Sequence, residues 1–216
     1  MYNINNDFNG SFQSSLGVKN CISKDLIYKA VLETNKEMLT IQQITKVNIF
    51  NTLGMRNLSA FIGETFVSTL EILSNDLFIK NPHQDGYPDL LLMDSNGKRI
   101  FKDLEEKLLI RHKEPFSPFK NGGIEVKATC GNVPSANQLA KKNMLKPEIG
   151  DTRLPLLSSF EWKAHHKETN NLLGIMWDFI DKIPVIVAVF FSSTLTEDHW
   201  GNVVKPKKGG GRTTSV

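Results

Sequence analysis

The segment that most constrains the fold is Gly122–Thr129, whose sequence is GGIEVKAT. Successive side chains of a β-strand point to opposite faces, so each residue of this segment can be assigned to a face. Small apolar residues occupy one face, at Ile124, Val126 and Ala128. Glu125 and Lys127 then share the other face, about one pleat repeat apart. The segment therefore predicts a central strand that carries a carboxylate and an ammonium group side by side.

A second carboxylate stands at the start of another apolar segment. Pro88–Met93 has the sequence PDLLLM, which predicts a short buried strand that begins beside Asp89. If the two strands are neighbours, Asp89 and Glu125 converge beside Lys127. Two carboxylates bind a hard divalent cation and leave its other positions to water and a phosphate oxygen of a substrate. The metal would polarise the phosphoryl group, while the lysine would orient or help to deprotonate the attacking water and balance charge.

The pattern Glu-x-Lys is weak by itself, because it occurs three times in this chain. The copy at Glu105 and Lys107 lies in a charge-rich stretch and predicts a solvated surface. The copy at Glu161 and Lys163 is a rival, because apolar residues alternate with it and Asp151 lies upstream. We favour the copy in the GGIEVKAT segment, because small apolar residues flank it and its upstream acid begins a strand, whereas Asp151 lies in a turn.

Length and composition predict an ordinary globular protein. The 216 residues, of which 40% are hydrophobic and 23% charged, fit a single domain over residues 1–216. The net charge of +3 is too small to identify a polyanionic partner. Two cysteines form no disulfide framework and suit a reducing cytosol. The polar N-terminus and the short apolar run at 183–191 predict no signal peptide or membrane span, so we expect a cytoplasmic protein.

The pattern along the chain predicts helices first and strands later. Residues 1–20, rich in Asn, Ser and Gly, are expected to form a loose arm. A helix is expected over 23–50 and another from Asn57 or Ser59 onward. The second helix carries one apolar stripe, made of Leu58, Ile62, Phe66, Leu70 and Leu73.

The second half combines turns, strands and one further helix. Asp94–Gly97 has the sequence DSNG, which predicts a hairpin turn. A helix is expected over 135–145. The remaining strands are expected over 158–165, 172–179 and 184–192. Because residues 213–216 look like the start of another strand, we expect the chain to stop before its fold is complete.

The order Pro88-Asp89, a 35-residue interval and Glu125-Val126-Lys127 resembles the signature of PD-(D/E)xK nucleases. It is most similar to bacterial type II restriction endonucleases, whose active-site strand often has a sequence like GIEVKAT. The motif covers few positions, but its setting spans residues 57–192. The resemblance implies the α/β (α+β) class, with a mixed central β-sheet flanked by helices. The long interval predicts an inserted hairpin or loop at 94–121.

The resemblance also implies an activity. It predicts Mg²⁺-dependent hydrolysis of phosphodiester bonds in double-stranded DNA at a specific short sequence, usually by a homodimer. Asp89 and Glu125 would bind Mg²⁺ and Lys127 would serve the attacking water. A cognate DNA methyltransferase in the same bacterial system is expected, with no contact implied. The family often adds a glutamate from the preceding helix, but Glu64 lies opposite the apolar stripe, which favours a surface role.

Three alternatives stay open at this point. The first is a repair or recombination nuclease of the same fold, the second a non-catalytic DNA-binding remnant, and the third an α/β domain with a surface ion pair. Paired His165 and His166 favour polar groups at a strand end over an HNH nuclease motif. Basic residues that would contact DNA or remain solvated are Lys141, Lys142, Lys205, Lys207, Lys208 and Arg212. Aromatic residues expected in the core are Trp162, Trp177 and Phe179.

Overall fold

The computed structural model describes residues 2–131, 135–141, 143, 145–151, 163–164, 169–204 and 214–215. Its centre is a six-stranded sheet with the strand order β3-β4-β5-β8-β9-β6. The sheet is mixed, because β5 pairs in parallel with β8 and β6 with β9, while the other neighbours are antiparallel. The strands are β3 (Phe78–Lys80), β4 (Leu90–Leu92), β5 (Gly123–Cys130), β6 (Ile149–Asp151), β8 (Leu172–Ile180) and β9 (Ile183–Ser192).

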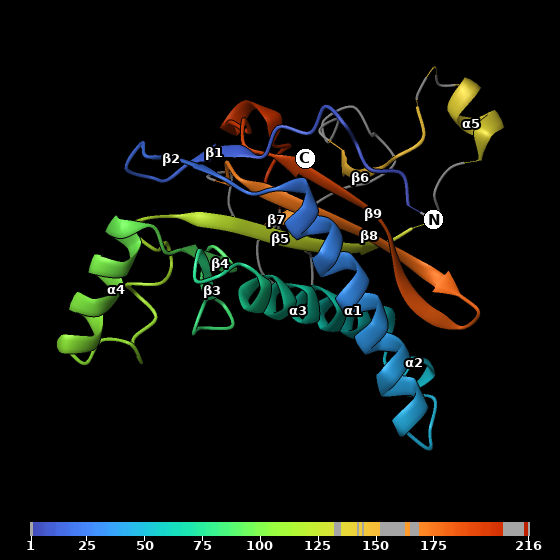
Figure 1. Ribbon diagram of the computed structural model, residues 1–216, viewed down its shortest axis with the longest axis horizontal. Helices are drawn as coiled ribbons and strands as arrows, with labels where there is room; N and C mark the ends of the chain where they lie inside the picture. The colour runs from blue at the N-terminus through green and yellow to red at the C-terminus, as the bar shows by residue number, and fades with distance from the viewer. Residues whose placement is uncertain are drawn as a thin grey trace.

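Helices flank this sheet, as Figure 1 shows. The two long helices contact each other, and both pack on strands: α1 (Lys24–Ile44) on β6 and β9, and α3 (Met55–Leu73) on β3 and β5. Shorter elements are α2 (Ile49–Thr52), α4 (Ser95–Glu106), α5 (Ala136–Lys141) and the 3-10 helix η2 (Glu197–His199). The expected mixed α+β architecture is therefore present. No helix within the described ranges is both long and apolar enough to cross a membrane.

The apolar stripe of α3 enters the main core as predicted. Leu58, Ile62, Phe66 and Leu70 are buried there, among residues of α1 and the sheet. The helix begins at Met55, a few residues before the predicted start, with Gly54 as its N-cap. Gly54 has no side chain to accept a hydrogen bond, so the usual capping signal is missing from the sequence.

The segment 94–97 is not the predicted hairpin turn. Asp94 is the N-cap of α4, and its side chain accepts hydrogen bonds from the backbone N–H groups of Asn96 and Gly97. The predicted insertion at 94–121 therefore contains a helix. A second hydrophobic cluster lies beneath it, made of Leu91, Met93, Leu104, Phe116 and Phe119. Because Leu90 and Leu92 face the main core, β4 is buried on both faces.

Residues 2–20 are not the predicted loose arm. They form the hairpin of β1 (Ser11–Gln13) and β2 (Lys19–Cys21), and Ile4 forms a parallel bridge with Ile149 of the edge strand β6. Phe12 is buried and stacks on Phe78. Long-range aromatic contacts therefore fix a segment whose polar composition is typical of loops.

The later predictions are met where the structure describes them. The strands expected over 172–179 and 184–192 are β8 and β9, and the expected helix near 135 is α5. Of the strand expected over 158–165, only residues 163–164 lie in a described segment. They form β7 (Lys163–Ala164), which pairs with β10 (Thr214–Ser215) and not with the main sheet.

Candidate functional site

Strand pairing brings the two predicted carboxylates together. In the antiparallel pair of β4 and β5, Leu90 lies opposite Ile124 and Leu91 opposite Gly123. Continuing this register by one residue places Asp89 opposite Glu125. The 35 residues between them comprise β4, α4 with its loops and the first two residues of β5, so the chain returns to pair with β4 and the interval does not keep the two residues apart.

Hydrogen bonds fix both carboxylates at this point. The backbone N–H of Val126 donates to Oδ2 of Asp89 at 2.8 Å. The backbone N–H of Asp89 donates in turn to Oε2 of Glu125 at 3.3 Å. Each strand therefore holds the acid of its neighbour, and the two carboxylates have little freedom to separate.

Lys127 lies between the two acids. Its Nζ is 2.5 Å from Oε1 of Glu125 and 3.5 Å from Oδ2 of Asp89. The Glu125 side chain is only 6% exposed, whereas those of Lys127 and Asp89 are about one quarter exposed. The structure therefore brings together all three residues that the sequence predicted, with two of them open to solvent and Glu125 beneath them.

Burial changes the protonation of this group. Removal from water raises the pKa of Glu125, the negative charge of Asp89 raises it further, and Lys127 lowers it, with the result that it stands at about 7. Burial lowers the pKa of Lys127, but the charges of Glu125 and Asp89 outweigh that effect and raise it. Lys127 is therefore a firmly protonated ammonium, and Glu125 titrates near neutrality.

Two cavities open over this cluster. One, of about 470 Å³, has Asp89 and Lys127 in its wall together with one side of α3. The other, of about 400 Å³, adjoins it and is lined by the turn that precedes Asp89. The two share Glu64, Val67, Gln84 and Asp89. The carboxylate of Asp89 is therefore accessible from a hollow that is large enough for part of a polymeric ligand.

Comparison with models of protein families, with curated proteins and with solved structures gives no significant match.

Glu64 lies closer to the site than its place on the helical wheel predicted. It lines both cavities with Asp89, and its Oε2 accepts from Nζ of Lys80 at 2.6 Å. The helix approaches β5 closely, since a Cβ on Gly63 would lie 3.5 Å from Cβ of Ala128. Glu64 remains exposed, as expected for a surface residue. A place in a metal shell was the less favoured alternative, and it is not tested by these contacts.

The donor set suits one kind of cation. Within the described ranges, no group of three or more His, Cys, Asp or Glu side chains is arranged to hold a metal. Asp89 and Glu125 are a pair, and Mg²⁺ commonly takes only one or two carboxylates from a protein and fills its remaining positions with water and phosphate oxygens. The fixed oxygens of the pair and the open space above Asp89 fit such an ion.

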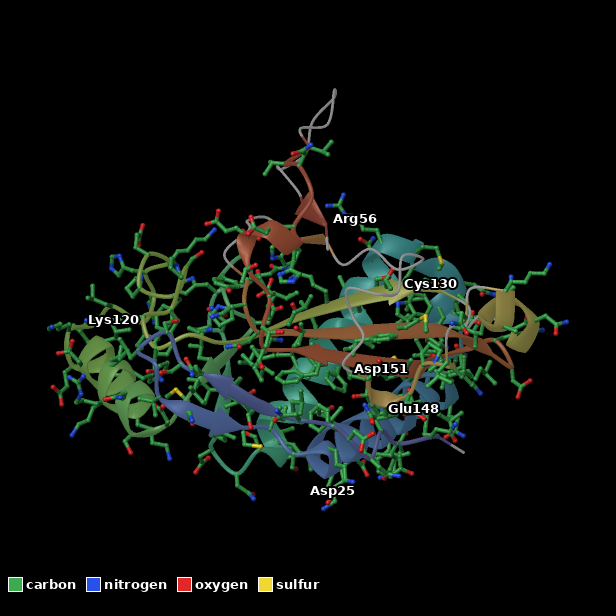
Figure 2. The ribbon with its side chains drawn as sticks, turned by 90° about the horizontal axis from the view of Figure 1, so that it is seen from above. Asp25, Arg56, Lys120, Cys130, Glu148 and Asp151 are labelled. Atoms are coloured by element: carbon green, nitrogen blue, oxygen red, sulfur yellow. The ribbon has the colours of Figure 1, made fainter. Side chains whose placement is uncertain are left out.

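The structure separates the rival acid from the favoured group. Asp151 is buried at the end of β6, so the prediction that it lies in a turn is wrong. Strands β8 and β9 lie between β6 and β5. Figure 2 labels Asp151 on the far side of these two strands from β5. Glu161 and the side chain of Lys163 lie outside the described residues, so the rival group cannot be assembled from them.

The other candidates have mixed outcomes. Trp177 is buried in the core as predicted, whereas Phe179 is partly exposed near the end of β8. Lys141 is exposed and is the last residue of α5. Candidates outside the described residues are Trp162, His165, His166, Lys142, Lys205, Lys207, Lys208 and Arg212.

Polar residues that line the cavities and were not predicted from the sequence include Arg56, Lys80 and Gln84. For Arg56 a signal was present, because Arg56, Ala60 and Glu64 follow each other at four-residue steps and so share one side of a helix. For Lys80, the last residue of β3, and Gln84, in the turn after it, the signal was their position within ten residues before Asp89.

Proposed function

We propose that this protein is a Mg²⁺-dependent endonuclease that hydrolyses phosphodiester bonds in double-stranded DNA at a short specific sequence, in the manner of type II restriction endonucleases. The observation that carries the proposal is the meeting of Asp89, Glu125 and Lys127 at an open cavity. The mixed sheet flanked by helices agrees with the restriction-endonuclease-like fold that the sequence motif implies.

The roles of the residues follow from their chemistry. Asp89 and Glu125 offer fixed oxygens to one divalent ion. When bound, Mg²⁺ supplies polarisation of the scissile phosphate and a lower pKa for water. Lys127 lies beside both acids, where its ammonium would donate hydrogen bonds to the attacking water and to phosphate oxygens and balance the developing charge.

Burial of Glu125 argues against an ordinary surface ion pair. A carboxylate that is 6% exposed loses most of its hydration, which costs several kcal/mol unless charges and hydrogen bonds compensate. A pair that served only solubility would stay in water, as Asp103 and Lys107 do on α4, where each side chain is more than half exposed. The buried position supports a role for this carboxylate in chemistry.

The test is cleavage of supercoiled plasmid by the purified chain in the presence of Mg²⁺. Asp89→Asn and Lys127→Met are expected to lose at least about 10²-fold in cleavage rate while keeping the fold, because each removes an interaction with the metal or the developing charge. Matched controls are Asp103→Asn and Lys107→Met, which break an exposed pair 2.8 Å apart on α4 and should cut like the wild type.

The same assay separates the alternatives. Discrete fragments support site-specific restriction, whereas a preference for branched or mismatched DNA supports a repair or recombination nuclease. Duplex binding with no Mg²⁺-dependent cutting supports a DNA-binding remnant. Undiminished cleavage by Asp89→Asn would disprove the assignment of the site.

A further inference from the structure

The two cavities form one groove along α3. They meet at Glu64, Val67, Gln84 and Asp89, which line both. Beyond this shared region, the larger cavity continues along the first turns of the helix to Arg56. Its wall on that side is made of small residues, namely Ser59, Ala60 and Gly63, with Ala128 of β5 opposite. The lining of the groove therefore extends from Asp89 and Lys127 along the helix to Arg56, past the point where Gly63 approaches Ala128.

Arg56 is placed where fold stability alone does not favour it. It lies in the first turn of α3, where the helix dipole disfavours a cation. That turn holds no acidic residue, and Arg56 forms no ion pair with any other described residue. Its side chain is exposed and, in Figure 2, lies near the end of β5 marked by Cys130.

The spacing matches a nucleic-acid strand. Arg56 and Glu64 are eight residues apart on one helix, which is about 12 Å along its axis. This distance equals the axial span of about three or four nucleotides in duplex DNA. A guanidinium group binds phosphate through paired hydrogen bonds, and it does so regardless of the base.

Resting on the proposed function, we infer that Arg56 is a positioning residue that binds a backbone phosphate of the cleaved strand, about three or four nucleotides along the groove from the position of Glu64. The strand lies in the groove along α3, with the scissile phosphate over Asp89 and Lys127. The contact fixes the register of the strand against the group of Asp89, Glu125 and Lys127.

The test is the salt dependence of binding to a short duplex of mixed sequence, measured by fluorescence anisotropy in EDTA so that no cutting occurs. The logarithm of the association constant falls linearly with the logarithm of the salt concentration. Between ~50 and ~200 mM KCl, loss of one phosphate contact should make this negative slope shallower by about one. We expect this loss in Arg56→Ala and the wild-type slope in Arg56→Lys, whose ammonium still neutralises a phosphate. Arg99→Ala, which removes an exposed arginine from α4, is the matched control.

The outcomes are distinct. An unchanged slope in Arg56→Ala, or an equal loss in Arg99→Ala, would overturn this inference and leave the nuclease proposal intact. A wild-type chain that binds no duplex at any of these salt concentrations would overturn the proposed function and the inference with it. Thermal melting of each variant checks that the exposed substitutions leave the fold unchanged.

Discussion

Glu125 is the residue whose surroundings matter most to the chemistry. Its pKa of about 7 lies well above the ordinary 4.5 because burial and Asp89 both disfavour its charge. Between these two values the folded chain holds a proton that the unfolded chain releases, so this group lowers stability as the pH rises through that window. A bound divalent cation reverses the preference, since it requires the ionised carboxylate.

Binding of Mg²⁺ should therefore strengthen as the pH rises. At about pH 6 roughly one tenth of Glu125 is ionised, and at about pH 8 roughly nine tenths, so affinity measured by calorimetry should rise about 10-fold. Asp89→Asn removes one cause of the high pKa and should move the midpoint to lower pH, with weaker binding overall. Glu125→Gln should bind weakly at both values. An affinity that stays flat in the wild type would contradict the role of Glu125 as a ligand.

At the scale of elements, β4 shows what local sequence can and cannot predict. The three leucines and the acid before them predict the strand and its part in the site, because apolar residues and turn signals are local. The sequence Asp-Ser-Asn-Gly, which begins at Asp94, is equally suited to a hairpin turn and to the N-cap of a helix, so it does not distinguish the two. Leu104 is buried in one cluster with Leu91 and Phe116. This packing favours the helix α4 over a turn at Asp94.

The cap at Asp94 can be tested by stability. Burial raises the pKa of Asp94, but hydrogen bonds from Gly97, Asn96 and the side chains of Asn121 and Asn20 outweigh this and lower it. Asp94→Ala should therefore reduce the free energy of unfolding at neutral pH by about 1–2 kcal/mol, measured by urea denaturation. The difference should shrink as the pH falls through the lowered pKa, where protonation removes the acceptor.

Ser95→Ala is the matched control for this cap, because Ser95 is the exposed neighbour and no side-chain hydrogen bond of it is found among the described residues. It should leave stability within about 0.5 kcal/mol of the wild type. Equal effects of the two substitutions would mean that Asp94 does not cap α4.

The position of α3 relative to β5 could not be predicted from local sequence patterns. The period of α3 identified its buried stripe, but the contacts of its other sides depend on where β5 passes beneath it. Glu64 and Arg56 therefore belong to the site because of the close approach of Gly63 to Ala128, a contact between residues far apart in the sequence. The meeting of Asp89, Glu125 and Lys127 could be predicted from the sequence because strand pairing alone brings them together.

At the scale of the whole molecule, the N-terminal segment supports the strand that carries the site. The hairpin of β1 and β2 is tied to the sheet through Asn171, whose Nδ2 donates to the carbonyl oxygens of Gln13 and Gly123. The backbone N–H of Ser15 also donates to the carbonyl oxygen of Asn121, just before β5. The start of the strand that bears Glu125 and Lys127 is thus held by residues over 100 positions earlier in the chain.

This support rests on Phe12, which is 3% exposed and stacks on Phe78 with 6.0 Å between ring centroids. Phe12→Ala should lower the free energy of unfolding by about 3–5 kcal/mol, because it removes a large buried side chain and leaves a cavity above β3. Leu16→Ala, in the same hairpin but 46% exposed, should change it by less than about 0.5 kcal/mol. Urea denaturation of both variants measures these changes in the free energy of unfolding. Small and similar changes would mean that residues 2–20 contribute as little to stability as the loose arm that composition predicted. A large change in Phe12→Ala alone is expected if this one aromatic side chain joins the polar segment to the core.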